Sequence, residues 1–314
     1  MLSVLMPVHA HRPEYLAAAI SSLLSQSSPE WELLMVAEPG NIGALEQELD
    51  RTLVDPRIGL IANEGRKLAG ALNTAMRHAI GSFAATLHAD DLWAPDAVTV
   101  LRRYIRAHPA ADFFHSGRRY VDERGRSISC VYPPPPDVRM ADFWRGSPVK
   151  HLLCWRREMA LAIGGMDETL NSVGPDDFDF PWTMAEHGAR FVAVPECLYI
   201  YRDHRECFRL TTHLPRRTHE RELRRILTKH GMPEVLVSDR VAAARATYLR
   251  QCLYSTAFEA RLRSLLRIER RDGWRERYQE RPQLRTGHAP PGGSCKPKER
   301  AAEGTSPRGQ TPHR

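Results

Sequence analysis

The sequence lacks the features that would place the protein in a membrane or give it a disulfide framework. No apolar run approaches the roughly 18 residues that a membrane-spanning helix needs. The first seven residues carry neither a basic leader nor a small-residue cleavage site, so they predict a strand and not a signal peptide. The six cysteines are scattered without C-x-x-C spacing, so neither a zinc site nor a disulfide framework is indicated. We therefore expect a cytoplasmic protein with reduced thiols.

Basic motifs interleaved with aromatic residues are also missing, and this argues against a nucleic-acid partner. The net charge is +7, and its arginine excess lies in the last third of the chain, for example at Arg216-Arg217 and Arg224-Arg225. One interpretation is a basic helical face that makes peripheral contact with an anionic membrane on its inner side. The other is a set of solvated arginines on amphipathic helices with interspersed glutamates.

Strand and helix signals alternate over about the first 110 residues. The predicted strands cover 3–8, 31–36, 57–61 and 83–87, and the predicted helices cover 13–25, 42–53 and 67–80. This alternation predicts an α/β fold with a mostly parallel, Rossmann-like sheet and helices on both faces. Ligands of such a sheet gather at the carboxyl ends of the strands, here near His9, Glu38 and Asp90-Asp91.

From about residue 113 the pattern changes. We predict a hairpin of 113–121 with 127–131, a proline-rich connector at 133–136, strands at 152–155 and 191–194, and helices at 159–163, 177–187, about 216–230 and about 235–271. After about residue 281 the composition predicts disorder. The expected organisation is a domain over 1–208 with halves at 1–110 and 111–208, a helical extension over 209–280, and a disordered basic tail over 281–314.

The adjacent carboxylates Asp90 and Asp91 follow the apolar run 82–87 and are the most informative pair in the chain. A buried strand would deliver them to the edge of the sheet where an open α/β fold binds its ligand. Adjacent ionised carboxylates repel each other, so the pair makes most sense with a divalent cation, Mn²⁺ or Mg²⁺, which would in turn hold a pyrophosphate.

Six short motifs in a fixed order resemble those of the family 2 glycosyltransferases with the GT-A fold. They are Ser3–His9, the series Asn63-Glu64-Gly65 to Ala71-Leu72-Asn73 to Ala79-Ile80-Gly81, Leu87–Asp91, Gly164–Glu168, Asp176–Asp179 and Tyr199–His204. The resemblance covers about residues 1–208. It implies an inverting, metal-dependent, hexosyltransferase-type enzyme that uses a nucleotide-sugar donor, with a UDP-sugar favoured. The acceptor would be a hydroxyl of a glycan, a lipid-linked molecule or a small molecule, in glycan or cell-surface polysaccharide synthesis.

The resemblance also implies roles for individual residues. The metal site would consist of Asp91, Asp90 and His204, and the catalytic base would be Asp177, with Asp176 beside it. Contacts to the nucleotide or donor are implied for Pro7, Val8, His9, Glu38, Lys67, Asn73 and Asp90. The acceptor or sugar pocket would include Gly165, Asp167 and Trp182. Simpler interpretations remain open, namely helix caps for the paired aspartates, a surface charge for Lys67 and core packing for Trp182.

Two segments depart from the family pattern. His88 replaces the first acid of the fuller D-x-D-D motif, and Ala37-Glu38-Pro39-Gly40 stands where the family usually has D-D-x-S. These departures keep open a second hypothesis, a catalytically impaired member that binds nucleotide sugars or acts as a scaffold. A nucleotidyltransferase is disfavoured, because residues 9–13 make a poor phosphate loop.

Overall fold

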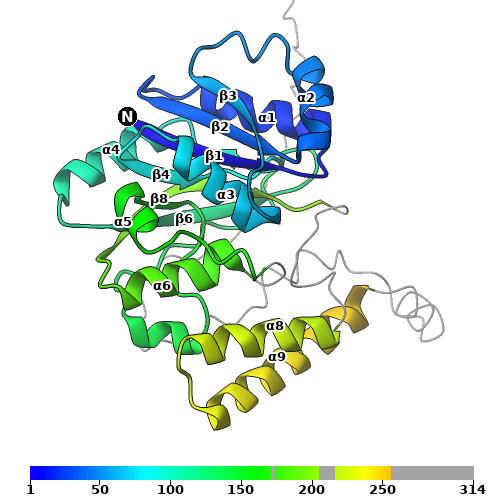
Figure 1. Ribbon diagram of the computed structural model, residues 1–314, viewed down its shortest axis with the longest axis vertical. Helices are drawn as coiled ribbons and strands as arrows, with labels where there is room; N and C mark the ends of the chain where they lie inside the picture. The colour runs from blue at the N-terminus through cyan, green and yellow to red at the C-terminus, as the bar shows by residue number, and fades with distance from the viewer. Residues whose placement is uncertain (171–173, 205–215, 256–314) are drawn as a thin grey trace, which may run out of the picture. The chain divides into compact units, whose positions relative to one another are not determined.

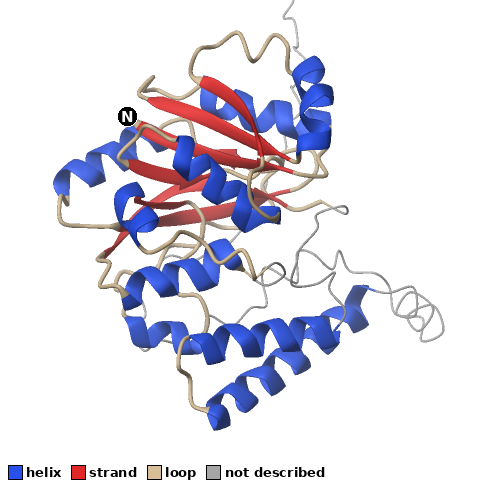
Figure 2. Cartoon of the chain, in the orientation of Figure 1, coloured by secondary structure: helices blue, strands red, loops and turns tan. Residues whose placement is uncertain are grey.

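The computed structural model describes residues 1–170, 174–204 and 216–255, with side chains as far as 246. All of these residues belong to one compact unit that covers residues 1–279. Its centre is an eight-stranded sheet in the order β3-β2-β1-β4-β7-β6-β8-β5, and helices cover it (Figure 1, Figure 2). The predicted tail at 281–314 lies outside the described residues, and the predicted domain boundaries stay predictions.

The first half of the sheet is wholly parallel. Its elements are β1 (Leu2–Val8), α1 (Pro13–Leu24), β2 (Trp31–Ala37), η1 (Pro39–Asn41), α2 (Ile42–Glu48), β3 (Ile58–Ala62), α3 (Lys67–His78) and β4 (Phe83–Thr86). The strands β1, β2 and β4 are buried on both faces because they carry apolar residues at consecutive positions. Leu2, Val4 and Met6 pack into one apolar cluster, while Leu5 between them packs into the other.

The second half is mixed. Its elements are β5 (Leu92–Trp93), α4 (Ala97–Ala107), β6 (Phe113–Val121), η2 (Met140–Arg145), β7 (Leu153–Arg156), α5 (Arg157–Ala162), η3 (Pro175–Asp179), α6 (Phe180–Glu186) and β8 (Phe191–Arg202). The strand β7 runs antiparallel to both of its neighbours, β4 and β6. Among the described residues four strand pairings are parallel and three antiparallel, so the prediction of a mostly parallel α/β sheet is confirmed.

The structure corrects two sequence predictions in this half. The expected hairpin partner at 127–131 forms only single bridges to β6, at Val121–Ser127 and Arg118–Tyr132. The strand expected at 191–194 continues to Arg202, because a register shift opposite Gly117 accommodates Pro195 and Glu196 as a bulge. A Cβ on Gly117 would lie 3.0 Å from the carbonyl oxygens of both bulge residues. As a result the motif at 199–202 lies within a strand beside β6 and β5.

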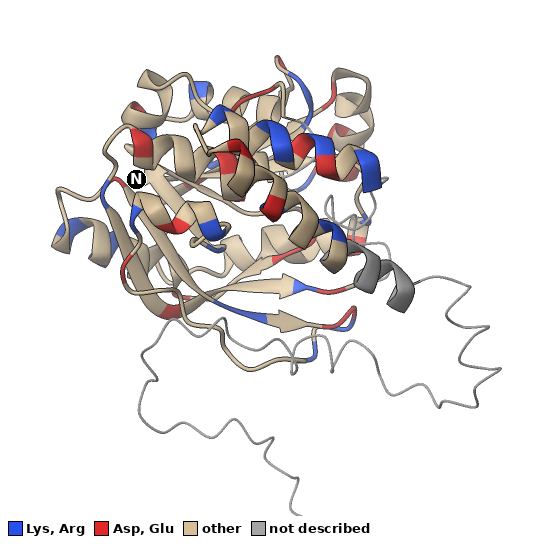
Figure 3. Cartoon of the chain, turned by 90° about the horizontal axis from the view of Figure 1, so that it is seen from below, with Lys and Arg blue, Asp and Glu red and all other residues tan. Residues whose placement is uncertain are grey.

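Two further helices, α8 (Arg216–Lys229) and α9 (Glu234–Ser255), confirm the predicted helical segment as far as the description extends. Their apolar residues form a third cluster with α6 and η2, in which Leu223, Ile226 and Val237 pack near Phe143 and Trp182. Figure 3 shows basic and acidic residues interspersed along these helices. Within the described ranges, no helix combines the length and the apolar character that crossing a bilayer would demand.

Candidate functional site

The two carboxylates after β4 have different surroundings. Asp91 is buried, with its Oδ2 accepting a 2.7 Å hydrogen bond from the Tyr199 hydroxyl and its Oδ1 accepting a 2.7 Å hydrogen bond from the backbone N–H of Arg202. Burial, together with the charge of Asp90, raises the pKa of Asp91 to about 8, although both hydrogen bonds act in the opposite direction. Asp91 therefore fastens the loop after β4 to the end of β8.

Asp90, in contrast, faces His204 and is 36% exposed at its side chain. The distance from Asp90 Oδ2 to His204 Nε2 is 3.1 Å, and the His204 ring lies 4.9 Å from the Tyr15 ring. Burial opposes ionisation of Asp90, but the hydrogen bond with His204 and the charge of His88 outweigh it and lower the pKa. The structure thus brings together two of the three predicted metal ligands, one with a carboxylate oxygen and one with an imidazole nitrogen.

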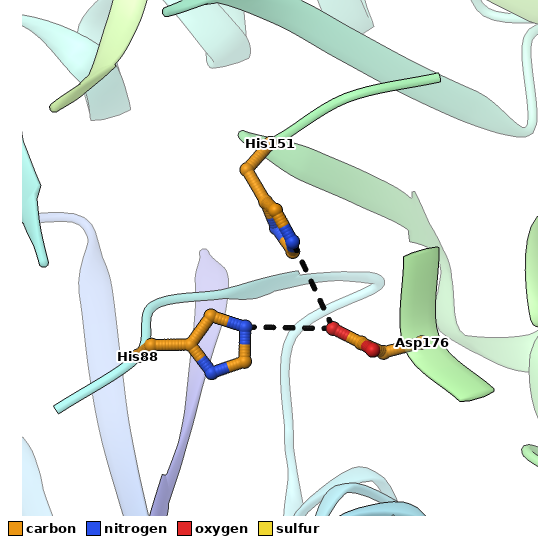
Figure 4. Close-up of side chains that lie close together, drawn as sticks. All are labelled: His88, His151 and Asp176. Atoms are coloured by element: carbon orange, nitrogen blue, oxygen red, sulfur yellow. Dashed lines mark ion pairs between the residues drawn. The ribbon is translucent and has the colours of Figure 1, made fainter. Parts of the chain in front are cut away.

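A second group of side chains gathers around Asp176 (Figure 4). The Asp176 Oδ2 atom lies 3.4 Å from His88 Nε2 and 3.8 Å from His151 Nε2. Burial works against a charge on His88, yet the hydrogen bond and charge of Asp176, aided by Asp91 and Asp90, raise its pKa to about 9. Burial and the positive charge of His88 lower the pKa of His151 to about 3. His88 thus forms an ion pair with the first carboxylate of the predicted catalytic pair.

Asp177 lies next to this pair in η3, after Gly174 with its left-handed φ of 45°. No side chain in the described ranges donates a hydrogen bond to its carboxylate, whereas its backbone oxygen accepts one from Ser147. Burial and the charge of Asp176 raise the pKa of Asp177, while Lys150 and Arg118 oppose the shift. Of the two predicted catalytic acids, Asp177 is therefore the one whose carboxylate receives no hydrogen bond from a described side chain and whose pKa is raised.

The asparagine and glycine motifs build a scaffold. The Asn73 side chain donates to Met166 O and Glu168 Oε1 and accepts from Met166 N, so it holds the Gly164–Glu168 turn against α3. Gly165 must lack a side chain there, because its φ is 74° and a Cβ would lie 2.5 Å from Asn73 Oδ1. The amide group and the amide oxygen of Asn73 are thus engaged with the turn, and the predicted contact of Asn73 with a donor stays a prediction.

The predicted nucleotide residues lie along the carboxyl ends of β1 and β2 and at the start of α3. Val8 is buried, Pro7 is half-buried and His9 is exposed. The Glu38 carboxylate accepts a 3.0 Å hydrogen bond from Asn63 Nδ2. Lys67 is exposed and has a left-handed φ of 54°, a costly conformation for a residue with a side chain. Their contacts with a nucleotide stay predictions.

Two residues of the predicted sugar pocket make other contacts. Trp182 is fully buried, and its ring stacks on that of His230 at a centroid distance of 4.1 Å. No face of this indole is open to a sugar, so core packing takes the place of the predicted contact. The Asp167 carboxylate accepts hydrogen bonds from Thr169 and lies 3.1 Å from Lys229 Nζ, which ties the turn to α8.

Several residues that shape this edge were not among the predicted site residues. Tyr199 is in a quoted motif, but its bond to Asp91 depends on β8 reaching residue 202. No spacing signal pointed to His151, which reaches the site only because β7 pairs with β4 in antiparallel orientation. Lys229 and His230 were likewise missed, and they bind Asp179 at 2.8 and 2.9 Å.

Comparisons with known proteins show which family and fold the chain resembles. Residues 3–148 match the family model described as Glycosyl transferase family 2. The O-antigen biosynthesis glycosyltransferase WbnJ of Escherichia coli is 25% identical over 208 residues, which cover 65% of this chain and 80% of that protein. The chain spans a fifth of the length of one other curated relative and 70% of another.

Solved structures show the same fold. S. aureus TarS 1–349 in complex with UDP-GlcNAc is similar with a TM-score of 0.58 at 15% identity, over 87% of this chain and 78% of that chain. The mannosyltransferase PcManGT from Pyrobaculum calidifontis, in complex with GDP-Man and Mn²⁺, is similar with a TM-score of 0.53 at 19% identity, over 88% and 81%. At these identities the similarity establishes the fold, and that fold is GT-A.

Proposed function

We propose that this chain, which matches the glycosyl transferase family 2 model over residues 3–148, moves a sugar, with inversion, from a nucleoside diphosphate to an acceptor hydroxyl. A UDP-sugar is the favoured donor, and cell-surface polysaccharide synthesis is the favoured context. Support comes from a relative named for O-antigen biosynthesis and from a fold neighbour solved with UDP-GlcNAc. The acceptor would be a glycan, a lipid-linked molecule or a small molecule.

The observation that carries the proposal is the pairing of Asp90 with His204 at the carboxyl end of β4. Their 3.1 Å spacing is close to the distance of about 3 Å between neighbouring ligands of an octahedral ion with bonds of about 2.1 Å. The second ring nitrogen of His204 is buried and lacks a hydrogen-bond partner in the described part of the chain. We therefore assign Mn²⁺ or Mg²⁺ to these two residues first. The hydrogen bonds that Asp91 accepts from Tyr199 and from the backbone of Arg202 hold the loop that carries Asp90.

A bound divalent cation would neutralise the charge that develops on the leaving diphosphate. The protein's own residues prepare that position. Arg202 fixes the loop through a 3.0 Å hydrogen bond from its Nε to the backbone oxygen of Asp90. The pairing of His204 with Asp90 keeps that carboxylate ionised, because it lowers the pKa of Asp90.

Asp177 is proposed as the general base. Its carboxylate is free of hydrogen bonds from described side chains, and its raised pKa makes it a stronger base than an exposed aspartate. Asp176 is less suited to this role, since its pKa is lowered by the hydrogen bond and charge of His88 despite its burial. Proton removal by one carboxylate and a single displacement at the sugar carbon would invert the anomeric configuration.

We do not extend the proposal to a membrane surface. The arginines of α8 and α9 are largely paired within the protein, with Arg216 and Arg245 beside Glu220 and Arg224 beside Glu234. Paired surface cations attract anionic lipid less than an unbalanced cluster does.

The test is a screen of purified full chain against UDP-, GDP- and dTDP-sugars, with donor hydrolysis as the readout and NMR to identify the anomer released. Asp177→Asn should lower turnover by about 10²- to 10⁴-fold and leave Mn²⁺-dependent UDP affinity unchanged. Asp90→Asn and His204→Gln should weaken UDP binding in the presence of Mn²⁺. Full turnover by Asp177→Asn would refute the assigned base. Metal-dependent UDP binding without turnover of any donor would favour the impaired, sugar-nucleotide-binding alternative.

A further inference from the structure

Three side chains from separate parts of the chain converge at the edge where β4 ends and β7 begins. His88 follows β4 by two residues, His151 precedes β7 by two, and antiparallel pairing of these strands brings both histidines to the same edge. Asp176 arrives from η3 on the other side (Figure 4). One ligand atom from each residue can be chosen so that all three lie within 4.8 Å of one another.

We propose that His88, His151 and Asp176 form a second metal site, selective for Zn²⁺ and separate from the Asp90–His204 pair. Two imidazoles with one carboxylate form a three-ligand set that zinc accepts while a fourth position stays open. The Asp90–His204 pair has one fewer nitrogen ligand and suits an ion that keeps several oxygen ligands. This inference concerns metal binding alone and does not require the proposed transfer reaction.

The distances support a nearly formed site. Zinc bonds of about 2.0–2.1 Å in tetrahedral geometry separate neighbouring ligand atoms by about 3.4 Å. The Asp176 to His88 distance is 3.4 Å, and the Asp176 to His151 distance is 3.8 Å. The two histidine rings meet edge to face with centroids 5.1 Å apart, so a small closure of the His151 ring toward His88 completes the set.

His151 lacks the partners that a buried imidazole usually has. Its Nδ1 atom is buried, and no group in the described ranges hydrogen bonds to it, while its Nε2 is 3.8 Å from the nearest carboxylate oxygen. The His151 side chain is 12% exposed, and a largely buried ring with so few polar partners is costly to maintain unless something else binds it. The Tyr199 ring, 5.2 Å away, packs against His151 and limits the directions in which it can turn.

The surrounding charges favour a cation at this position. Besides Asp176, the carboxylate of Asp90 acts on His88. Lys150 and Arg118 supply the opposing positive charge. Zn²⁺ would add positive charge at this position, and both imidazoles would bind it in their neutral form.

Metal binding to the full chain is tested by titrating Zn²⁺ in a calorimeter and Co²⁺ in an absorption spectrometer, without any donor. His88→Gln and His151→Gln should each weaken zinc binding by about a hundredfold or more and abolish the visible bands of cobalt bound in a site of low coordination number. His204→Gln should leave both signals unchanged. His78→Gln, which removes an exposed histidine beside Glu64, is the matched control for surface binding.

Circular dichroism verifies that each variant is folded, and two separate histidine variants guard against the loss of one to misfolding. Unchanged zinc affinity in a folded His88→Gln or His151→Gln protein would overturn the proposal. Loss of the signal in His204→Gln would overturn it as well, because zinc would then occupy the Asp90–His204 pair. Neither outcome would affect the transferase assignment, which is tested by donor turnover.

Discussion

The hydroxyl of Tyr199 donates a 2.7 Å hydrogen bond to Asp91 Oδ2, which joins the last part of β8 to the loop after β4. The contact is buried on both sides, and it spans 108 positions of the sequence. With the Arg202 backbone N–H it gives the carboxylate two donors, which only partly compensate for the loss of water. The position of Asp90 beside His204 depends on this support, since Asp90 and Asp91 share one short loop.

Asp91→Asn should make the protein less sensitive to pH. An aspartate whose pKa rises from 3.8 to about 8 on folding contributes stability at low pH that is lost as the pH increases through about 8. The free energy of unfolding of Asp91→Asn relative to wild type should therefore increase between pH 5 and pH 8. Urea unfolding in EDTA at both pH values measures this. If the difference in unfolding free energy between variant and wild type does not change with pH, the raised pKa of Asp91 is contradicted.

His88→Gln should show a pH dependence of its own. Folding raises the pKa of His88 from 6.5 to about 9, so the stabilisation by its ion pair is complete below pH 6.5 and is lost as the pH increases through 9. The variant should be destabilised by roughly 1–3 kcal/mol at pH 6 and much less at pH 10. Unfolding by urea at pH 6, 8 and 10 provides the comparison.

The matched control for His88→Gln is His187→Gln. His187 is exposed, and its ring bonds to the backbone oxygen of Thr183 and to no described carboxylate. Its replacement should change the unfolding free energy little across this range. An equal pH dependence in both variants would show that the ion pair of His88 with Asp176 does not cause the pH dependence of stability.

The sequence alone predicted the first half of the fold well, because apolar runs alternate there with helical periodicity and the strands pair in parallel. It also predicted that Asp90 and His204 lie at one edge of the sheet, and the structure brings these two residues together. It could not assign each carboxylate its partner. Tyr199 reaches Asp91 through a bulged strand, and His151 reaches Asp176 through antiparallel β7, so both contacts depend on tertiary structure.

Asp179 is a further example of a partner hidden from local sequence. In the motif it looks like a third acid of the catalytic segment, but it is buried and binds Lys229 and His230 from α8 and the turn after it. The residues near Asp179 in the sequence do not indicate that its partner is Lys229, 50 positions away. The pattern of a motif therefore shows that a residue matters without showing whether it acts in chemistry or in packing.

His230→Ala should loosen the attachment of α8 and α9. The His230 ring stacks on Trp182 at 4.1 Å, and its two nitrogens lie 2.9 Å from Asp179 Oδ1 and Glu186 Oε1. Loss of the ring leaves a cavity and removes one hydrogen-bond partner from the buried Asp179 carboxylate. The expected cost is about 2–4 kcal/mol. Urea unfolding followed by tryptophan fluorescence measures the change.

His230→Phe separates the two contributions, because it keeps the stacking on Trp182 and removes the polar contacts. Its stability should fall between those of wild type and His230→Ala. A variant as unstable as His230→Ala would show that the stacking contributes nothing, and one equal to wild type would show the same for the bonds to the carboxylates.

Gly165→Ala should be more destabilising than Gly164→Ala, although both glycines have a left-handed φ, 74° and 87°. At Gly164 no atom lies within 4 Å of a new Cβ, so the cost is backbone strain alone, about 1 kcal/mol. At Gly165 the Cβ would lie 2.5 Å from Asn73 Oδ1, so the amide must also give up its bonds to the turn. We expect about 1–3 kcal/mol more, measured by urea unfolding.

A double-mutant cycle with Asn73→Ala identifies the cause of that difference. Once the Asn73 amide is gone, the atom that collides with the new Cβ is gone too, so Gly165→Ala should cost about as much as Gly164→Ala. If the excess cost persists in the Asn73→Ala background, the collision is with something other than Asn73.

UDP affinity, measured on the same proteins, distinguishes a residue that holds the turn from one that contacts the donor. Because the hydrogen bonds of Asn73 to described residues go to Met166 and Glu168, Asn73→Ala should reduce stability more than it reduces UDP binding at temperatures where the variant stays folded.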